Sequence, residues 1–217
     1  MGQPFEFYSE TGIRIWTGIK ADNLKSLLEA VRTVRGSAIF YHMHHSLFRR
    51  HFTAADYMND FARWVLLNQS QEVLAEKLAS IDPWEYNTVR EVREVLMDYL
   101  DRYIGEGERF QRVPAGSEFF FLEQRSALFP TGLVAANLKE FFSCLQYASC
   151  SSFFFHLVEA RLRLGRKSND FSEWLGNSLG ESELAQRIAS ISPYQYNLWG
   201  IREKVLSLVG ERLADAS

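Results

Sequence analysis

The chain has few of the residues that mark several protein classes. Its 217 residues include only two cysteines, Cys144 and Cys150, and five prolines. Two cysteines without metal-ligand spacing exclude a disulfide scaffold and a cysteine zinc site, and free thiols are typical of the cytoplasm. No apolar run approaches the roughly 18 residues that span a membrane, and the first residues lack the basic and apolar regions of a signal peptide. We therefore expect a cytoplasmic protein with no membrane partner.

An excess of positive charge is also missing. The formal net charge is −3, whereas a general nucleic-acid binder is normally basic, so we expect no nucleic-acid partner. The sequence contains no nucleophile elbow, phosphate-binding glycine loop or dinucleotide-binding fingerprint. Aromatic residues make up 14% of the chain. Most of them should lie in the core, because each buries a large apolar area.

The most prominent feature of the sequence is an internal repeat. Asn59–Asn87 matches Asn169–Asn197 at 12 of 29 positions, with an offset of 110. Upstream, Phe5–His42 matches the segment 114 residues later at 11 of 38 positions. A period this long predicts a duplicated domain arranged about a pseudo-two-fold axis rather than a solenoid. The expected divisions are repeat 1 over 5–103, a linker over 104–118 and repeat 2 over 119–213.

Hydrophobic spacing predicts a mainly α protein, with about five helices and a short extended or β arm in each repeat of about 100 residues. In repeat 1 the runs on either side of Gly12 should form a small hairpin or an extended arm, and Thr17-Gly18 should open the first helix. The later helices of repeat 1 are expected at about 37–49, from about 59, at 72–81 and at 82–103.

Helix start signals refine these boundaries. Ser37 and Ser151 are predicted N-caps. Asp170 and Glu173 together predict a capping box. The segment beginning at Asp82-Pro83 has a cap residue followed by proline at the first helical position, which predicts the start of the last helix of the repeat.

The second copy resembles a known family. The residues that carry the resemblance are Pro130-Thr131-Gly132, Phe155-His156, Glu159-Ala160-Arg161, Asn169-Asp170-Phe171 and Trp174. They resemble the uncharacterised bacterial family of unknown function DUF5752, over nearly the whole chain. Some members of that family stand alone and others are joined to glycosyltransferase domains. The resemblance implies a glycosyltransferase or another carbohydrate enzyme as partner. The family has no established activity, so the catalytic residues and any cofactor stay unknown.

Four side chains form a candidate metal site. His42 and His45 are three residues apart on a predicted helix and share one face, and their counterparts are His156 and Glu159. If the pseudo-two-fold axis passes between these helices, the set would suit zinc or iron. The alternative, which we favour, is that the two shared histidines have structural hydrogen-bond partners.

Asn59, Asp60 and their counterparts Asn169 and Asp170 are candidates for binding a ligand hydroxyl. These residue types also cap helices, because their side chains accept hydrogen bonds from backbone amides. Capping is the interpretation we favour.

Arg49 and Arg163 belong to basic clusters in the two copies. Clustered arginines bind phosphate through paired hydrogen bonds. Cations also stabilise the C-terminal end of a helix, and this second interpretation is the one we favour.

Two functions follow. The first is a non-catalytic interaction or accessory module linked to a glycosyltransferase or to carbohydrate metabolism. The alternative is a metal- or phosphosugar-binding enzyme with its site between the two repeats. The lack of a catalytic motif and the divergence of polar positions between the copies favour the module.

Overall fold

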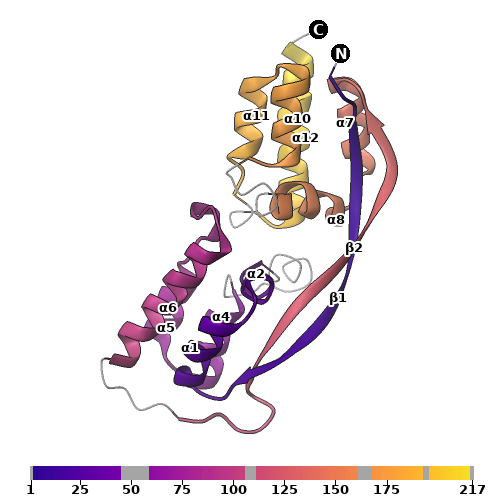
Figure 1. Ribbon diagram of the computed structural model, residues 1–217. Helices are drawn as coiled ribbons and strands as arrows, with labels where there is room; N and C mark the ends of the chain where they lie inside the picture. The colour runs from indigo at the N-terminus through magenta and orange to yellow at the C-terminus, as the bar shows by residue number, and fades with distance from the viewer. Residues whose placement is uncertain (1, 45–58, 106–110, 161–167, 193–195, 216–217) are drawn as a thin grey trace. The chain divides into compact units, whose positions relative to one another are not determined.

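The computed structural model describes residues 2–44, 59–105, 111–160, 168–192 and 196–215. The chain divides into two compact units (Figure 1). The continuous unit is Ile13–Arg125, and the split unit combines Met1–Gly12 with Ser126–Ser217. The division falls inside two long strands, β1 (Phe5–Ala21) and β2 (Phe119–Ala135), so each strand has residues in both units.

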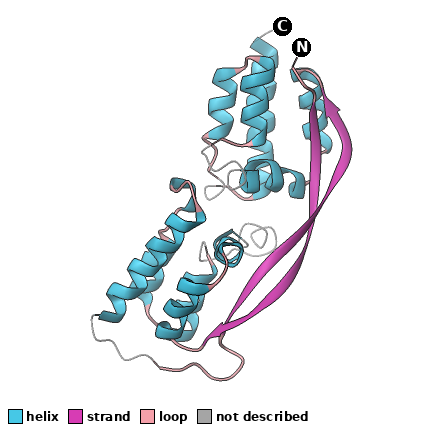
Figure 2. Cartoon of the chain, in the orientation of Figure 1, coloured by secondary structure: helices cyan, strands magenta, loops and turns pink. Residues whose placement is uncertain are grey.

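The two strands pair as one two-stranded sheet (Figure 2). The Thr17 hydroxyl donates to the Phe121 carbonyl, and the Thr131 hydroxyl donates to the Phe7 carbonyl, each at 2.8 Å. Residue numbers therefore rise along one strand as they fall along the other, and the pairing is antiparallel.

Of the two forms expected around Gly12, the structure shows the extended one. No hairpin forms there, because β1 continues through this position and pairs with a strand more than 100 residues away. The helix predicted to open at Thr17-Gly18 is wrong. Both residues lie in β1, and helix α1 begins at Leu24 after the N-cap Asn23. The hydroxyl of Thr17 binds a strand carbonyl instead of a helix amide.

Helices make up most of the described chain. Those of the continuous unit are α1 (Leu24–Thr33), α2 (Gly36–His44), α4 (Asp60–Trp64) with the π turn Val65–Gln69, α5 (Glu72–Ala79), the 3₁₀ turn Pro83–Glu85 and α6 (Val89–Gly105). Those of the split unit are α7 (Leu138–Tyr147), α8 (Cys150–Phe153) with the π turn Phe154–Glu159, α10 (Asp170–Leu179), α11 (Ser182–Ala189) and α12 (Leu198–Asp215). No helix among the described residues is both long enough and apolar enough to cross a membrane.

Asparagine begins several of these helices. Asn59 and Asn169 cap α4 and α10 by accepting from the backbone N–H of the third helical residue. The capping box of α10 therefore pairs Asn169 with Ser172, and the predicted box of Asp170 with Glu173 is wrong by one position.

The serine caps were also misplaced. Ser149, not Ser151, caps α8. Ser37 lies inside α2, and its hydroxyl donates to Glu123 at 2.7 Å. The proline start signal was misread as well, because Pro83 forms a separate 3₁₀ turn capped by Asp82, and α6 begins only at Val89. The corresponding segment 193–195 lies outside the described residues.

Each unit has an aromatic core to which a strand contributes two phenylalanines. In the continuous unit Phe119 of β2 stacks on Phe61 with ring centroids 5.0 Å apart, and Trp64 meets Phe119 edge-on. In the split unit Phe5 of β1 packs against Phe171 and Trp174. Phe61 and Phe171 are 0% exposed, Trp64 is 7% exposed and Trp174 is 8% exposed, so all four are buried in these cores.

Replacing Trp64 with alanine should lower the free energy of unfolding by about 3–5 kcal/mol, the usual range for a buried large aromatic. Trp64 is 7% exposed, and its indole N–H donates to the Ser117 carbonyl at 2.8 Å. Trp16→Ala is the matched control, because Trp16 is 55% exposed and its loss should cost under about 1 kcal/mol. Urea denaturation measures both, and equal effects would contradict the core assignment.

Glu118 should titrate far below an ordinary glutamate. Its hydrogen bond from Lys20, at 2.9 Å, and backbone hydrogen bonds lower the pKa of Glu118 from 4.5 to about 2. Because the folded-state pKa is depressed, the stabilisation is present above about pH 4.5 and is lost as the pH falls through about 2. An NMR titration should show this midpoint, and Lys20→Met should raise the pKa of Glu118. An unchanged pKa in the variant would show that Lys20 is not the cause.

Candidate functional site

The two shared histidines make the same contacts in the two units. In the split unit His156 Nδ1 lies 2.8 Å from Asp170 Oδ2, and the Tyr8 backbone N–H donates to His156 Nε2 at 2.9 Å. The ring is 3% exposed. We call this arrangement of a histidine, an aspartate and a strand amide the clasp.

The clasp of the continuous unit uses His42. Its Nδ1 lies 2.9 Å from Asp60 Oδ2, and the Leu122 backbone N–H donates to its Nε2 at 2.9 Å. In both units the histidine lies in or just after the second helix, the aspartate opens the next helix, and the amide belongs to a strand.

These hydrogen bonds fix the tautomer of each imidazole. A backbone N–H only donates, so Nε2 must be the unprotonated acceptor. Nδ1 then carries the proton and donates it to the aspartate. Each ring is thus a neutral imidazole whose two nitrogens are both engaged. In this state neither His42 nor His156 offers a lone pair to a metal ion or to a substrate proton.

Aromatic side chains surround both imidazoles. His156 stacks on Phe171 with centroids 5.3 Å apart, and Phe5 lies 5.0 Å away. The ring centroid of His42 lies 4.6 Å from that of Phe119 and 5.7 Å from that of Phe61. A polar ring in such surroundings is costly unless its nitrogens have partners. The aspartate and the strand amide provide them.

The neighbouring Asn and Asp residues divide two tasks between them. Asn59 and Asn169, at 2% and 0% exposed, cap their helices. Asp60 and Asp170, one position later, hold the histidines. Because the two residues are adjacent, the asparagine side chain caps the backbone N–H groups of the helix while the aspartate carboxylate faces the imidazole.

The remaining predicted site residues do not assemble into a metal site in the described chain. No group of three or more His, Cys, Asp or Glu side chains that could hold a metal ion occurs among the described residues. His45, Arg49 and Arg163 lie outside them, and Glu159 ends the π turn after α8. Burial raises the pKa of the thiols of Cys144 and Cys150, which keeps both protonated.

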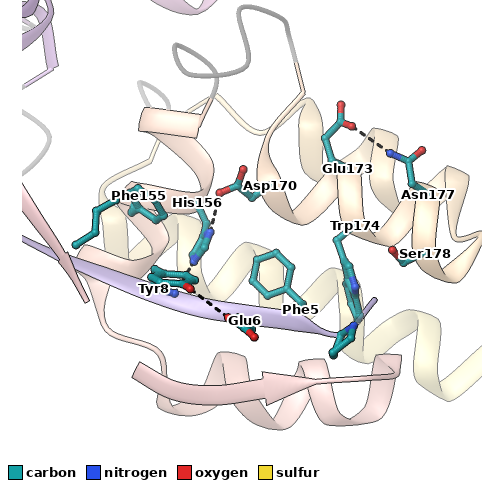
Figure 3. A pocket seen from close by; sticks show the side chains of 12 residues that line it. Phe5, Glu6, Tyr8, Phe155, His156, Asp170, Glu173, Trp174, Asn177 and Ser178 are labelled. Carbon is teal, nitrogen blue, oxygen red and sulfur yellow. Dashed lines mark hydrogen bonds and ion pairs between the residues drawn. The ribbon is translucent and has the colours of Figure 1, made fainter. Parts of the chain in front are cut away.

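A pocket of about 490 Å³ opens in the split unit beside the clasp (Figure 3). His156 and Asp170 form part of its wall, and most of the other lining residues come from β1 and α10, with Leu128 from β2 and Phe155 from the π turn. Its lining residues are Pro4, Phe5, Glu6, Tyr8, Leu128, Phe155, His156, Asp170, Glu173, Trp174, Asn177 and Ser178.

Two further carboxylates in this pocket carry hydrogen bonds. The Tyr8 hydroxyl donates to Glu6 Oε2 at 3.1 Å, and this bond, with the charge of Glu6, raises the pKa of the Tyr8 phenol. Asn177 Nδ2 donates to Glu173 Oε2 at 3.1 Å. The phenol therefore stays protonated near neutral pH.

Sequence reasoning missed these four pocket residues because it looked for polar residues shared by both copies. Glu6, Tyr8, Glu173 and Asn177 all differ from their counterparts at the same offsets. Those counterparts are Phe120, Leu122, Arg63 and Leu67. The signal that could have identified them is that these polar residues differ between the two copies although they lie close in sequence to residues that both copies share.

The fold and the clasps define a mostly helical protein in which buried histidines bind the backbone of a two-stranded sheet. The chain belongs to DUF5752, a family of unknown function whose model matches residues 2–210. The resemblance seen in the sequence is thereby confirmed. Among solved structures, OrfY from Thermoproteus tenax is similar, with 32% sequence identity and a TM-score of 0.84. The match covers 99% of this chain and 97% of that one. No curated protein matches the chain.

His156→Ala should destabilise the chain by about 3 kcal/mol, because a buried donor and a buried acceptor each lose their partner at roughly 1–3 kcal/mol. Amide hydrogen exchange adds a local readout. His156→Ala should accelerate exchange at Tyr8 and spare Leu122, and His42→Ala should do the reverse. Asp170→Asn, which keeps an acceptor oxygen, should cost less. Unchanged exchange at Tyr8 in His156→Ala would show that the clasp is not formed in solution.

Proposed function

We propose that the chain is a non-catalytic interaction module, built from two copies of one helical unit and accessory to a carbohydrate enzyme. One observation carries the proposal. Both ring nitrogens of each shared histidine are committed to internal hydrogen bonds. The two imidazoles are the strongest candidates for chemistry in the sequence. In the structure, each one accepts a hydrogen bond from a strand amide and donates one to an aspartate.

Matching contacts support the duplication. The Trp64 indole donates to the Ser117 carbonyl, and the Trp174 indole donates to the Gln3 carbonyl, at 2.8 and 2.7 Å. Ser117 follows Gln3 by the same 114 positions that separate the two arms in the sequence. The threonine hydroxyls that reach across the sheet, from Thr17 and Thr131, are also 114 positions apart. Repeated tertiary contacts at one offset are what a duplicated domain produces.

The pattern of divergence supports binding rather than catalysis. The clasp, the asparagine cap and the buried aromatics occur in both copies, and each has a structural partner. The polar residues beside the clasp differ between the copies. A shared scaffold with changed surfaces is what binding modules need, because affinity and specificity depend on the exposed side chains. The resemblance noted in the sequence supports a glycosyltransferase as the partner.

The test compares the wild type with the double variant His42→Asn, His156→Asn. Asparagine keeps hydrogen-bonding capacity at smaller size, so the melting temperature should fall modestly while the metal content by elemental analysis stays the same. Neither protein should turn over nucleotide sugars. A stoichiometric metal ion or a turnover that the double variant loses would overturn the proposal and favour an enzyme.

A further inference from the structure

The alternation of backbone groups along β1 decides which of its residues face away from β2. In an antiparallel ladder, both backbone groups of one residue point to the partner strand, and both groups of the next residue point away from it. Tyr8 fixes this alternation, because its N–H donates to His156 Nε2 and its carbonyl accepts from the Ser152 hydroxyl. The backbone of Tyr8 therefore points away from β2, and so does that of every second residue along the ladder.

The same alternation extends to Arg14 and Trp16. Two threonine hydroxyls bind carbonyls of the opposite strand and mark the register at two points of the ladder. The number of residues between these two contacts is the same on β1 as on β2, so neither strand has an extra residue there. The N–H and C=O groups of Arg14 and Trp16 thus point away from β2, as those of Tyr8 do.

In the continuous unit these backbone groups lie at an open edge of the sheet. The clasp of this unit holds the other strand, because His42 binds the Leu122 amide of β2. No described group outside the sheet bonds to the backbone of Arg14 or Trp16. Trp16 is 55% exposed and Ile13 is 73% exposed. An open strand edge is a surface on which another chain can add a strand.

The corresponding edge of β2 in the split unit is closed. Pro130 stands at the position of Trp16, with the same offset of 114, and proline has no N–H to offer. The Cys144 thiol donates to the carbonyl of Val134 at 3.5 Å. Proline on a strand edge protects a sheet against pairing with another chain. The continuous unit has tryptophan where this protection would stand, so its edge is available for pairing.

The side chains along the open edge are apolar and basic. Trp16 meets Phe120 edge-on, with ring centroids 6.3 Å apart, and Phe120 is 40% exposed. Arg14 is also exposed. The segment Ile13–Lys20 contains no acidic residue. A second copy of this strand would therefore bring no carboxylate, whereas a strand with an acidic residue opposite Arg14 gains a favourable cross-strand pair.

We propose that the edge of β1 at Ile13–Thr17 receives an extended segment of a partner polypeptide as a third strand of the sheet. The segment carries an aromatic or apolar side chain that packs on Trp16 and an acidic residue opposite Arg14. Pairing stops at Gly18, whose φ of 83° departs from the extended conformation. This inference rests on the proposed interaction module and names the kind of segment that the module recognises.

The probe is the blocked heptapeptide Thr-Glu-Val-Tyr-Val-Glu-Thr, whose sequence is the same in both directions and so suits parallel or antiparallel pairing. NMR titration of the full chain should shift the amide signals of Arg14 and Trp16. Bound peptide should slow hydrogen exchange at both amides and leave Tyr8 unchanged. The matched peptide with lysine in place of glutamate should bind more weakly.

Methylation of the peptide's own backbone nitrogens tests strand pairing directly. One peptide carries N-methyl groups on the two glutamates and the tyrosine, and the other carries them on the two valines. Because only one of these alternate sets faces β1, one peptide should lose binding and the other should keep it. Binding through side chains alone would make the two peptides equal.

Variants of the chain separate the backbone from the side chains. Trp16→Pro copies the residue of β2 and removes the open N–H, so it should abolish binding, whereas Trp16→Ala keeps the N–H and should weaken binding less. Arg14→Glu should weaken binding of the glutamate peptide about fivefold and strengthen that of the lysine peptide, because a cross-strand attraction becomes a repulsion. Arg90→Glu, at an exposed position of α6, is the control and should bind as the wild type does. Thermal melting checks that every variant is folded.

Several results would overturn the proposal. Exchange protection at Arg14 and Trp16 that appears without peptide and rises with protein concentration would identify a second copy of the chain as the occupant. Unshifted amides of these two residues in the folded wild type, equal binding of the glutamate and lysine peptides, or equal binding of the two methylated peptides would also overturn it. These measurements are independent of the metal content and turnover of the histidine variants, so failure here is distinguishable from failure of the proposed module.

Discussion

The hydrogen bond from a strand amide to a buried imidazole is the constraint on which each unit depends. Tyr8 shows why, because its N–H reaches His156 and its carbonyl accepts from the Ser152 hydroxyl at 2.7 Å. Both backbone groups of this strand residue are thus satisfied by side chains of α8 and of the π turn that follows it. The aspartate completes the arrangement by fixing the tautomer. Without it the ring could present Nε2–H to the strand, and two donors would face each other.

Local sequence signals were enough to predict the helices and the family, but not the strands. The spacing of apolar residues located α5 within about two residues, because this helix buries one continuous face. The sequence left β1 open between a hairpin and an extended arm and began a helix too early, because the partner strand lies more than 100 residues away. The alternation of residues within a strand indicates a strand but does not identify its partner. The capping box of α10 was missed by one position because asparagine and aspartate are adjacent, and either can cap a helix.

The candidate site was only partly visible for a related reason. Repetition drew attention to His42 and His156, and the structure shows that both serve the scaffold. Under the proposed duplication, positions kept in both copies are those that folding requires twice, whereas positions that differ are released from that requirement. Glu6 and Glu173 belong to the second group, and they line the pocket. A search for shared polar residues therefore finds the clasp and passes over the residues that line the pocket.

The clasp and the pocket share residues, so a ligand in the pocket would contact the strand that the clasp holds. His156 and Asp170 belong to both, while Phe5, Glu6 and Tyr8 come from β1. A ligand that touches β1 and α10 together binds only when the strand is held in place, because separating the two removes half of its contacts. By mass action such a ligand stabilises the clasped state by RT ln(1 + [L]/Kd). A ligand in the pocket would thus stabilise the hydrogen bond between His156 and the strand, without any reaction at the imidazole.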